Sequence, residues 1–123
     1  GTVYAVDIQE TVIRRLQKRI EKERVINIVP KIDDVYQLSF DDASVDRVLM
    51  VACLPEIPDK VRALKEIRRV LKPDGRVCLC ELFPDPDYPF RSTEKKWAAA
   101  AGLELKADFG NWFTYQLHFG RPE

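Results

Sequence analysis

Asp7 is the residue best placed to do chemistry. It ends a run of strand-forming residues, Gly1-Thr2-Val3-Tyr4-Ala5-Val6-Asp7, directly ahead of a helical pattern. Nucleotide-binding α/β sheets use such a terminal carboxylate to accept hydrogen bonds from ribose hydroxyls. A glycine-rich turn normally precedes this acid by about 20 residues, and the printed sequence has no room for one before Asp7. We therefore expect a cofactor-binding α/β fold that lacks its first strand, its phosphate-side loop and its first helix.

Other candidate side chains follow later strand-like runs. Asp33 and Asp34 follow the next run, and the alternative to a binding role for them is a solvated turn. For Asp7 the corresponding alternative is that it only caps the following helix. Cys53 follows the strongly apolar run Val45 to Ala52, and no base partner for it is visible. We expect Cys53 to be a small buried residue rather than a nucleophile.

The cysteine and histidine content argues against a metal site. The three cysteines, Cys53, Cys78 and Cys80, lack CxxC spacing, and His118 is the one histidine. This set makes neither a disulfide framework nor a familiar zinc site, so we expect no metal and a reducing, cytoplasmic setting. Cys78 and Cys80 should pack on one strand face. His118 should share a face with Thr114 and Gln116 in a structural role, with proton transfer the less favoured alternative.

The elements that must position these residues alternate between strand and helix patterns. Strands are predicted at 3–6, 25–32, 45–52, 76–83, 103–109 and 113–119. One helix is predicted at 9–24. A second begins at an Asp59 cap and stops at Lys72-Pro73-Asp74-Gly75. A third is capped by Ser92 or Thr93 and ends at Gly102. The order β-α-β-β-α-β-α-β-β predicts a mostly parallel sheet with a C-terminal antiparallel hairpin around Gly110-Asn111.

Composition limits the possible classes. The chain has 123 residues, 46% of them hydrophobic, which indicates a single domain spanning 1–123 with a sizeable core. Lys+Arg and Asp+Glu both number 20, so a nucleic-acid or anionic-membrane surface based on bulk charge is not expected. No apolar run approaches the roughly 20 residues that span a bilayer.

Four segments, in order, resemble class I S-adenosylmethionine-dependent methyltransferases of the type 11, ubiquinone-biosynthesis-like group. They are VYAVDI, IDDVYQLSFDDASVDRV, LPEIPDKVRALKEIRRVLKPDGRVCLCE and AGLELKADFGNWFTYQLHF. The resemblance covers essentially the whole chain and implies the Rossmann-like sheet of that family. Two departures stand out: the family's glycine-rich motif is absent, and Asp74 stands where the family usually has glycine.

The resemblance implies S-adenosylmethionine as cofactor, S-adenosylhomocysteine as product and a small-molecule acceptor. By resemblance, Asp7 holds the ribose diol and Ile8 offers an apolar face to the adenine. Asp34 accepts from the adenine amino group, and the Val35 N–H meets a ring nitrogen. Ala52 and Cys53 approach the sulfonium. Methyl transfer relies mainly on positioning, so no catalytic triad is expected, and the catalytic residues remain unassigned.

Side chains that could face an acceptor are few in the sequence. Glu56 and Tyr88 lie on loops where they could do so, and Trp112 at the hairpin is expected to pack rather than to stack on a substrate.

Two other functions stay open. A non-catalytic remnant of the family could act as a binding or dimerisation module, and a nicotinamide dehydrogenase fits the LKPDG turn and closing hairpin less well. In the resembled family the first strand lies at the centre of the sheet, so losing it would expose two edges. We therefore expect the missing segment to be supplied elsewhere, upstream or by a partner chain, with a homodimer as another possibility.

Overall fold

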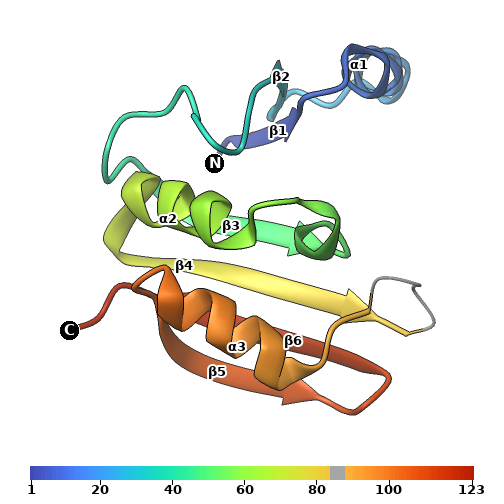
Figure 1. Cartoon of the computed structure of the whole chain (residues 1–123). Helices are drawn as coiled ribbons and strands as arrows, with labels where there is room; N and C mark the ends of the chain where they lie inside the picture. The colour runs from blue at the N-terminus through green and yellow to red at the C-terminus, as the bar shows by residue number, and fades with distance from the viewer. Residues whose placement is uncertain (84–87) are drawn as a thin grey trace. The chain divides into compact units, whose positions relative to one another are not determined.

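The computed structural model describes residues 1–83 and 88–123, so part of the loop predicted at 84–89 lies outside the described residues (Figure 1). The chain separates into two compact units, Gly1–Ser39 and Phe40–Glu123. The single domain predicted for 1–123 stays a prediction.

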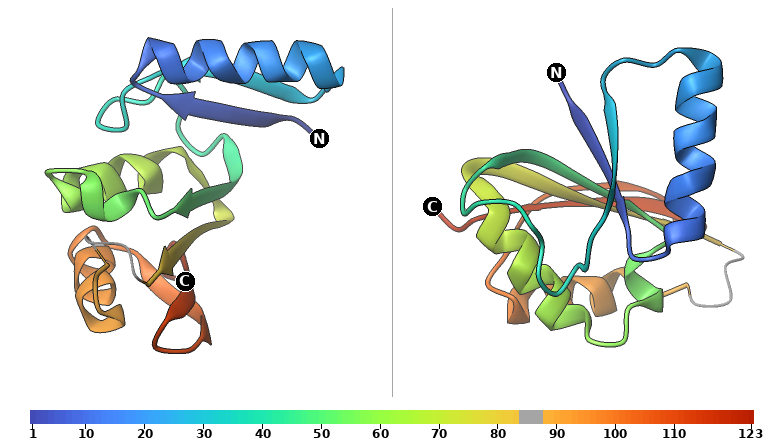
Figure 2. Two further views of the ribbon diagram at one scale, coloured as in Figure 1. Left: turned by 90° about the vertical axis from the view of Figure 1, so that its right-hand side faces the viewer. Right: turned by 90° about the horizontal axis from the view of Figure 1, so that it is seen from above.

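The first unit is a β-α-β unit. Strand β1 (Val3–Asp7) pairs in parallel with β2 (Ile28–Ile32), and Asp7 lies opposite Ile32. Helix α1 (Glu10–Glu23) runs along one face of this pair, and its Ile13 is 3% exposed (Figure 2). The strand predicted from Val25 begins only at Ile28, because Arg24 is the left-handed C-cap of α1 and the Val25 N–H donates to the Ile20 carbonyl, which closes the helix end.

The second unit is a sheet of four strands in the order β3-β4-β6-β5. Strands β3 (Val45–Val51) and β4 (Leu71–Leu82) are parallel, whereas β6 (Thr114–Gly120) is antiparallel to both β4 and β5 (Glu104–Gly110). A 3-10 turn, η1 (Leu54–Glu56), and helices α2 (Lys60–Val70) and α3 (Arg91–Ala100) complete the unit. The α/β class, the parallel pairing and the closing hairpin are confirmed.

Helices α2 and α3 lie on the same face of this sheet, and the core lies beneath them (Figures 1 and 2). Fully buried members of this core come from both layers: Leu64, Ile67, Val77, Leu79, Leu117 and Phe119. Burying a side chain of this size contributes about 1.5–3 kcal/mol. The opposite face carries Cys78 and Cys80, whose sulfurs are 3.5 Å apart, so the predicted shared face is confirmed.

Two predicted boundaries are wrong. Lys72 to Gly75 was expected to separate helix from strand, but α2 ends at Val70, and β4 starts at Leu71 and includes these residues. Leu71 is fully buried and pairs with Val45, while Arg76 pairs with Arg47, so the extra residues form an irregularity inside the strand.

The start of the third helix also differs from the prediction. Helix α3 begins at Arg91 with Phe90 at its N-cap, and no side chain caps it, so neither Ser92 nor Thr93 is the cap. The predicted cap of α2 is confirmed, since the Asp59 carboxylate accepts from the Arg62 N–H at 3.0 Å. Gly102 (φ +81°) ends the α3 segment, as predicted.

Candidate functional site

Asp7 lies at the carboxyl end of β1, the end at which open parallel sheets bind ligands. Its Oδ1 accepts a hydrogen bond from the Gln9 N–H at 2.8 Å, which orients the carboxylate at the start of α1. Its Oδ2 receives no hydrogen bond from the described residues. Ile8 follows immediately and is 67% exposed. The N-cap of α1 is Gln9 and no side chain caps the helix, so Asp7 is not its cap, and one of its carboxylate oxygens remains for a ligand.

The loop after β2 reaches the same end of the first unit. The Asp33 N–H donates to the Asp7 carbonyl at 3.1 Å, which ties the two strand ends together. The Asp33 carboxylate is used within the loop, because its Oδ2 accepts from both the N–H and the hydroxyl of Ser39. Asp34 is exposed, and its Oδ1 accepts only from the Tyr36 N–H among the described residues. The structure thus brings Asp7, Ile8, Asp34 and Val35 to one end of this unit.

Ala52 and Cys53 follow β3 in the second unit. The Ala52 N–H donates to the Cys80 carbonyl at 2.8 Å, so β4 holds this turn from the side. Ala52 has φ +50°, a left-handed conformation that a non-glycine residue adopts only at a cost. Both residues are half-buried, and Cys53 stands at the N-cap of η1. Such strain often marks a binding site, a signal that residue type alone did not provide.

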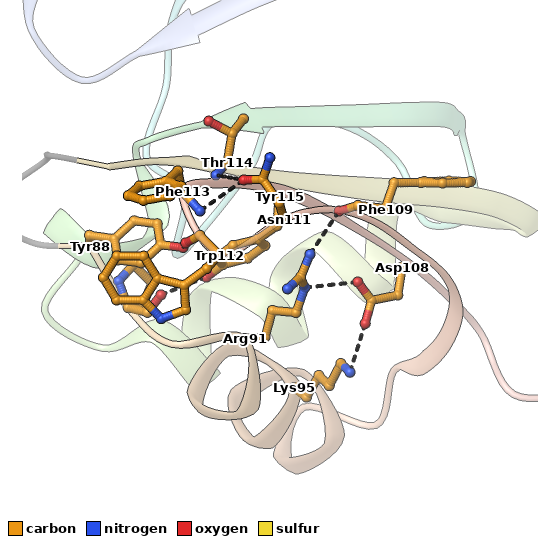
Figure 3. Close-up of polar contacts among 11 residues, drawn as sticks. Tyr88, Arg91, Lys95, Asp108, Phe109, Asn111, Trp112, Phe113, Thr114 and Tyr115 are labelled. Carbon is orange, nitrogen blue, oxygen red and sulfur yellow. Dashed lines mark hydrogen bonds and ion pairs between the residues drawn. The ribbon is translucent and has the colours of Figure 1, made fainter.

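Five aromatic side chains gather at the carboxyl end of β4 and the tip of the β5–β6 hairpin. This aromatic cluster consists of Phe83, Tyr88, Trp112, Phe113 and Tyr115, and its neighbouring ring centroids are 5.2–6.1 Å apart. Phe83, Trp112 and Phe113 remain 45%, 53% and 57% exposed. Trp112 packs, as predicted, within this cluster (Figure 3), yet about half of its surface stays exposed.

Backbone hydrogen bonds fix the geometry of this cluster. The Phe83 N–H donates to the Phe113 carbonyl at 2.7 Å, and the Tyr88 hydroxyl donates to the Trp112 carbonyl. Asn111 Oδ1 accepts from the N–H groups of Phe113 and Thr114 at 2.9 and 3.1 Å (Figure 3). The rings are therefore held in place before any ligand arrives. Sequence reasoning singled out Tyr88 and Trp112 separately and did not bring them together.

Two buried carboxyl groups lie beneath the aromatic cluster. Glu81 and Glu94 are 1% and 0% exposed. Burial raises the pKa of Glu94, and the neighbouring Glu81 and Tyr115 side chains offset this in part. Burial also raises the pKa of Tyr115, and Glu94 adds to that effect. Neither glutamate was singled out from the sequence, because one stands in an apolar strand and the other on a charged helix.

His118 and Cys78 lie on the sheet face that points away from α2 and α3. The His118 ring contacts Phe109 with centroids 5.4 Å apart, consistent with a packing role. Burial raises the pKa of Cys78 to about 11, and Cys80 adds to the shift, so this thiol stays protonated at neutral pH. Among residues 1–83 and 88–123, no group of three or more His, Cys, Asp or Glu side chains could hold a metal ion. Within the same residues, no helix has the length and apolar character needed to cross a bilayer.

Comparisons with known proteins agree on one family. The family described as "Methyltransferase domain" matches residues 1–79. A demethylmenaquinone methyltransferase of Lactiplantibacillus plantarum is 30% identical over 117 residues, which are 94% of this chain and 48% of that protein. A ubiquinone/menaquinone biosynthesis C-methyltransferase of Acidiphilium cryptum is 40% identical over 82% of this chain and 41% of its own length. The chain thus spans about half the length of these relatives.

A solved structure shows the same fold. The SAM-dependent methyltransferase of Aquifex aeolicus superposes with a TM-score of 0.86 at 20% identity, covering 97% of this chain and 68% of that one. At this identity the likeness concerns the fold alone, and it confirms the Rossmann-like class expected from the sequence.

Proposed function

Because the chain belongs to the methyltransferase domain family, we propose that its protein transfers a methyl group from S-adenosylmethionine to a small-molecule acceptor. The observation that carries the proposal is the Asp7 carboxylate, placed at the end of a parallel strand with one oxygen open to a ligand. When bound, the cofactor supplies an electrophilic methyl group on a sulfonium, so the protein has chiefly to bind and align.

In the first unit, the described residues fit a nucleoside. Asp7 Oδ2 would accept from a ribose hydroxyl, and the exposed Ile8 side chain would cover one face of the base. Asp34 Oδ2 would accept from an exocyclic amino group, and the Val35 N–H, which donates to none of the described residues, would bind a ring nitrogen. Asp33 does not suit this role, since its carboxylate is bound to Ser39.

In the second unit, Ala52 and Cys53 are proposed for the sulfonium side of the cofactor. The turn between β3 and η1 is held by the Cys80 carbonyl and keeps Ala52 in its left-handed conformation. This fixes the local backbone without a charged side chain. The leaving thioether departs neutral, so its departure needs no general acid. The acceptor releases one proton when it takes the methyl group, and that proton passes to a base or to water; no residue of this chain is given that role.

The aromatic cluster favours an acceptor with an apolar, planar ring. Its exposed rings lie at the carboxyl end of β4, and aromatic rings stack on one another with a gain of about 0.5–1.5 kcal/mol per pair beyond area burial. One of the relatives above is named a demethylmenaquinone methyltransferase, and the other is named for ubiquinone/menaquinone biosynthesis. A reduced quinone or a simpler phenol is therefore the acceptor class to test first.

The decisive test is calorimetric titration of S-adenosylhomocysteine into this chain and into the product of its whole gene. Asp7→Ala should weaken binding by about 10- to 100-fold, because hydrogen bonds to a charged group contribute about 1.5–3 kcal/mol. Asp41→Asn is the matched control, since Asp41 is an exposed acid in the second unit, and its affinity should be unchanged.

The competing function is a non-catalytic scaffold that serves binding or dimerisation. If neither form bound S-adenosylhomocysteine while both were folded, the transferase proposal would fail and the scaffold would remain. If binding were tight but Asp7→Ala had no effect, the proposed ribose contact would be wrong.

A further inference from the structure

Glu81 and Glu94 are the two charged residues that the described part of the chain buries almost completely. Glu81 lies on β4 opposite Tyr115 of β6, and Glu94 lies in the first turn of α3. These two carboxyl groups therefore meet between the sheet and the helix that covers it. Buried carboxyl groups in such a layer are costly unless they are neutral or compensated.

In its charged form Glu94 is compensated only in part. Neither of its carboxyl oxygens has a hydrogen-bond partner among the described residues. The nearby Tyr115 hydroxyl is not available, because it donates to the Pro89 carbonyl at 2.8 Å. A fully buried carboxylate with two unsatisfied oxygens is the form that burial disfavours most, whereas a protonated carboxyl group is tolerated.

The cations around this layer are engaged elsewhere. Arg91 of α3 stacks on the Tyr115 ring at 5.0 Å, and its guanidinium donates to Asp108 of β5 at 2.9 Å. Lys95 also binds Asp108 at 2.9 Å (Figure 3). On the α2 side, Lys60 lies over the Trp97 ring at 5.2 Å.

The groups that face Glu94 are themselves acids, and they offset the effect of its burial only in part. Glu81 approaches it from β4, Tyr115 from β6, and Tyr88 from the segment before α3. Ionised Glu94 would therefore meet another carboxyl group and two phenols rather than a cation.

We propose that Glu94 is a neutral carboxylic acid in the folded protein, and that its ionisation loosens the start of α3 and the aromatic cluster from the sheet. The link to the cluster is direct, since Tyr115 contacts Glu94 and its ring packs on Tyr88 with centroids 5.6 Å apart. Protonated Glu94 thus keeps the start of α3 and the aromatic cluster packed on the sheet, an arrangement called the proton-dependent latch below.

The sign of the pH dependence follows from the raised pKa of Glu94, caused first by burial. The folded state holds this proton to a higher pH than the unfolded state does. The protonated group therefore makes its whole contribution to the free energy of unfolding below the ordinary pKa of 4.5. Stability is then lost as pH rises from that value through the pKa in the folded state. The effect of one such group is at most about a tenfold change in the unfolding constant per pH unit.

Urea unfolding of the full chain between pH 5 and 8.5, followed by tryptophan fluorescence, tests the latch. Both tryptophans, Trp97 and Trp112, belong to the second unit, so the signal reports that unit alone. The wild-type unfolding constant should rise with pH relative to that of Glu94→Gln, which keeps the size of the side chain and cannot ionise. The exposed Glu104 on β5 provides the control, and Glu104→Gln should retain the wild-type pH dependence.

A second measurement does not depend on any variant folding. Titration of the Glu94 carboxyl carbon by NMR in the wild-type chain should give a midpoint above 4.5. In a Trp97→Phe background, Trp112 fluorescence of the folded protein should change with the same midpoint. A Glu94 midpoint at the ordinary value, or a Glu94→Gln protein with the wild-type pH dependence, would overturn the proposal. Neither readout needs cofactor or acceptor, so its outcome is independent of the methyl-transfer proposal.

Discussion

Replacing Gly110 with alanine should open the hairpin that carries Trp112 and Phe113. Gly110 ends β5 with φ +98°, a region that other residues rarely adopt. A Cβ at this position would lie 2.2 Å from the Thr114 carbonyl oxygen and 2.8 Å from the Tyr115 Cα. Both are backbone atoms on the facing strand, so the clash cannot be relieved by rotating a side chain.

The expected magnitude combines three effects. The positive φ costs alanine about 1–2 kcal/mol. The displaced Thr114 carbonyl would also lose the hydrogen bond from the Asn111 N–H, now 2.8 Å long, at about 1 kcal/mol. Moving one strand away from the other adds a packing loss, so we expect a total destabilisation of about 3 kcal/mol.

Gly102 provides the matched control, because it too has a positive φ, +81°, but the atoms nearest to an added Cβ belong to the Arg68 side chain, the closest at 3.4 Å. Gly102→Ala should therefore cost only the conformational part, about 1–2 kcal/mol. Urea unfolding followed by tryptophan fluorescence measures both variants in the same unit. If Gly110→Ala were no more destabilising than Gly102→Ala, the backbone clash would not govern this turn and the reasoning would be refuted.

Two further substitutions test the contacts of α3. Asp108→Asn should lower the unfolding free energy by about 1 kcal/mol at pH 7, a modest value because Asp108 is 33% exposed. The hydrogen bond from Lys95, followed by the charges of Lys95 and Arg91, lowers the pKa of Asp108. The stability difference between wild type and Asp108→Asn should therefore disappear as pH falls below 3.8 through the folded-state pKa. A difference that persisted at lower pH would contradict the ion pairs proposed for Asp108. Tyr115→Phe should cost about 1–3 kcal/mol by leaving the buried Pro89 carbonyl unpaired, whereas Tyr88→Phe, at an exposed hydrogen bond, should cost under about 0.5 kcal/mol when both are measured by urea unfolding.

Much of the candidate site in the first unit could be predicted from local sequence. A strand that ends in Asp7 before a helical pattern places that carboxylate at the carboxyl end of the sheet, whatever the rest of the chain does. The choice of Asp34 over Asp33 came from the resemblance, and the structure adds a physical reason, since Ser39 occupies the Asp33 carboxylate. The contact between Asp33 and Ser39 joins residues six apart within a loop, so the periodicity of the sequence could not predict it.

The second unit shows where local rules give way to packing. Ser92 and Thr93 are favourable caps by residue type, yet α3 starts earlier, at Arg91, which reaches Asp108 on a distant strand. Similarly, Lys72-Pro73-Asp74-Gly75 is a strong turn signal, but Leu71 is drawn into the core and the turn becomes part of β4. In both cases long-range burial or pairing outweighs a local preference worth about 1 kcal/mol.

The sequence by itself determined the order of the elements, the α/β class, the closing hairpin and the strand-end carboxylate, because these depend on periodicity and on neighbouring residues. Only the tertiary structure decided that Glu94 is buried beside Glu81, that Ala52 is held at a positive φ, and that five aromatic rings form one cluster. Such features arise from residues far apart in the chain, and their energies depend on the dielectric environment and packing that folding creates.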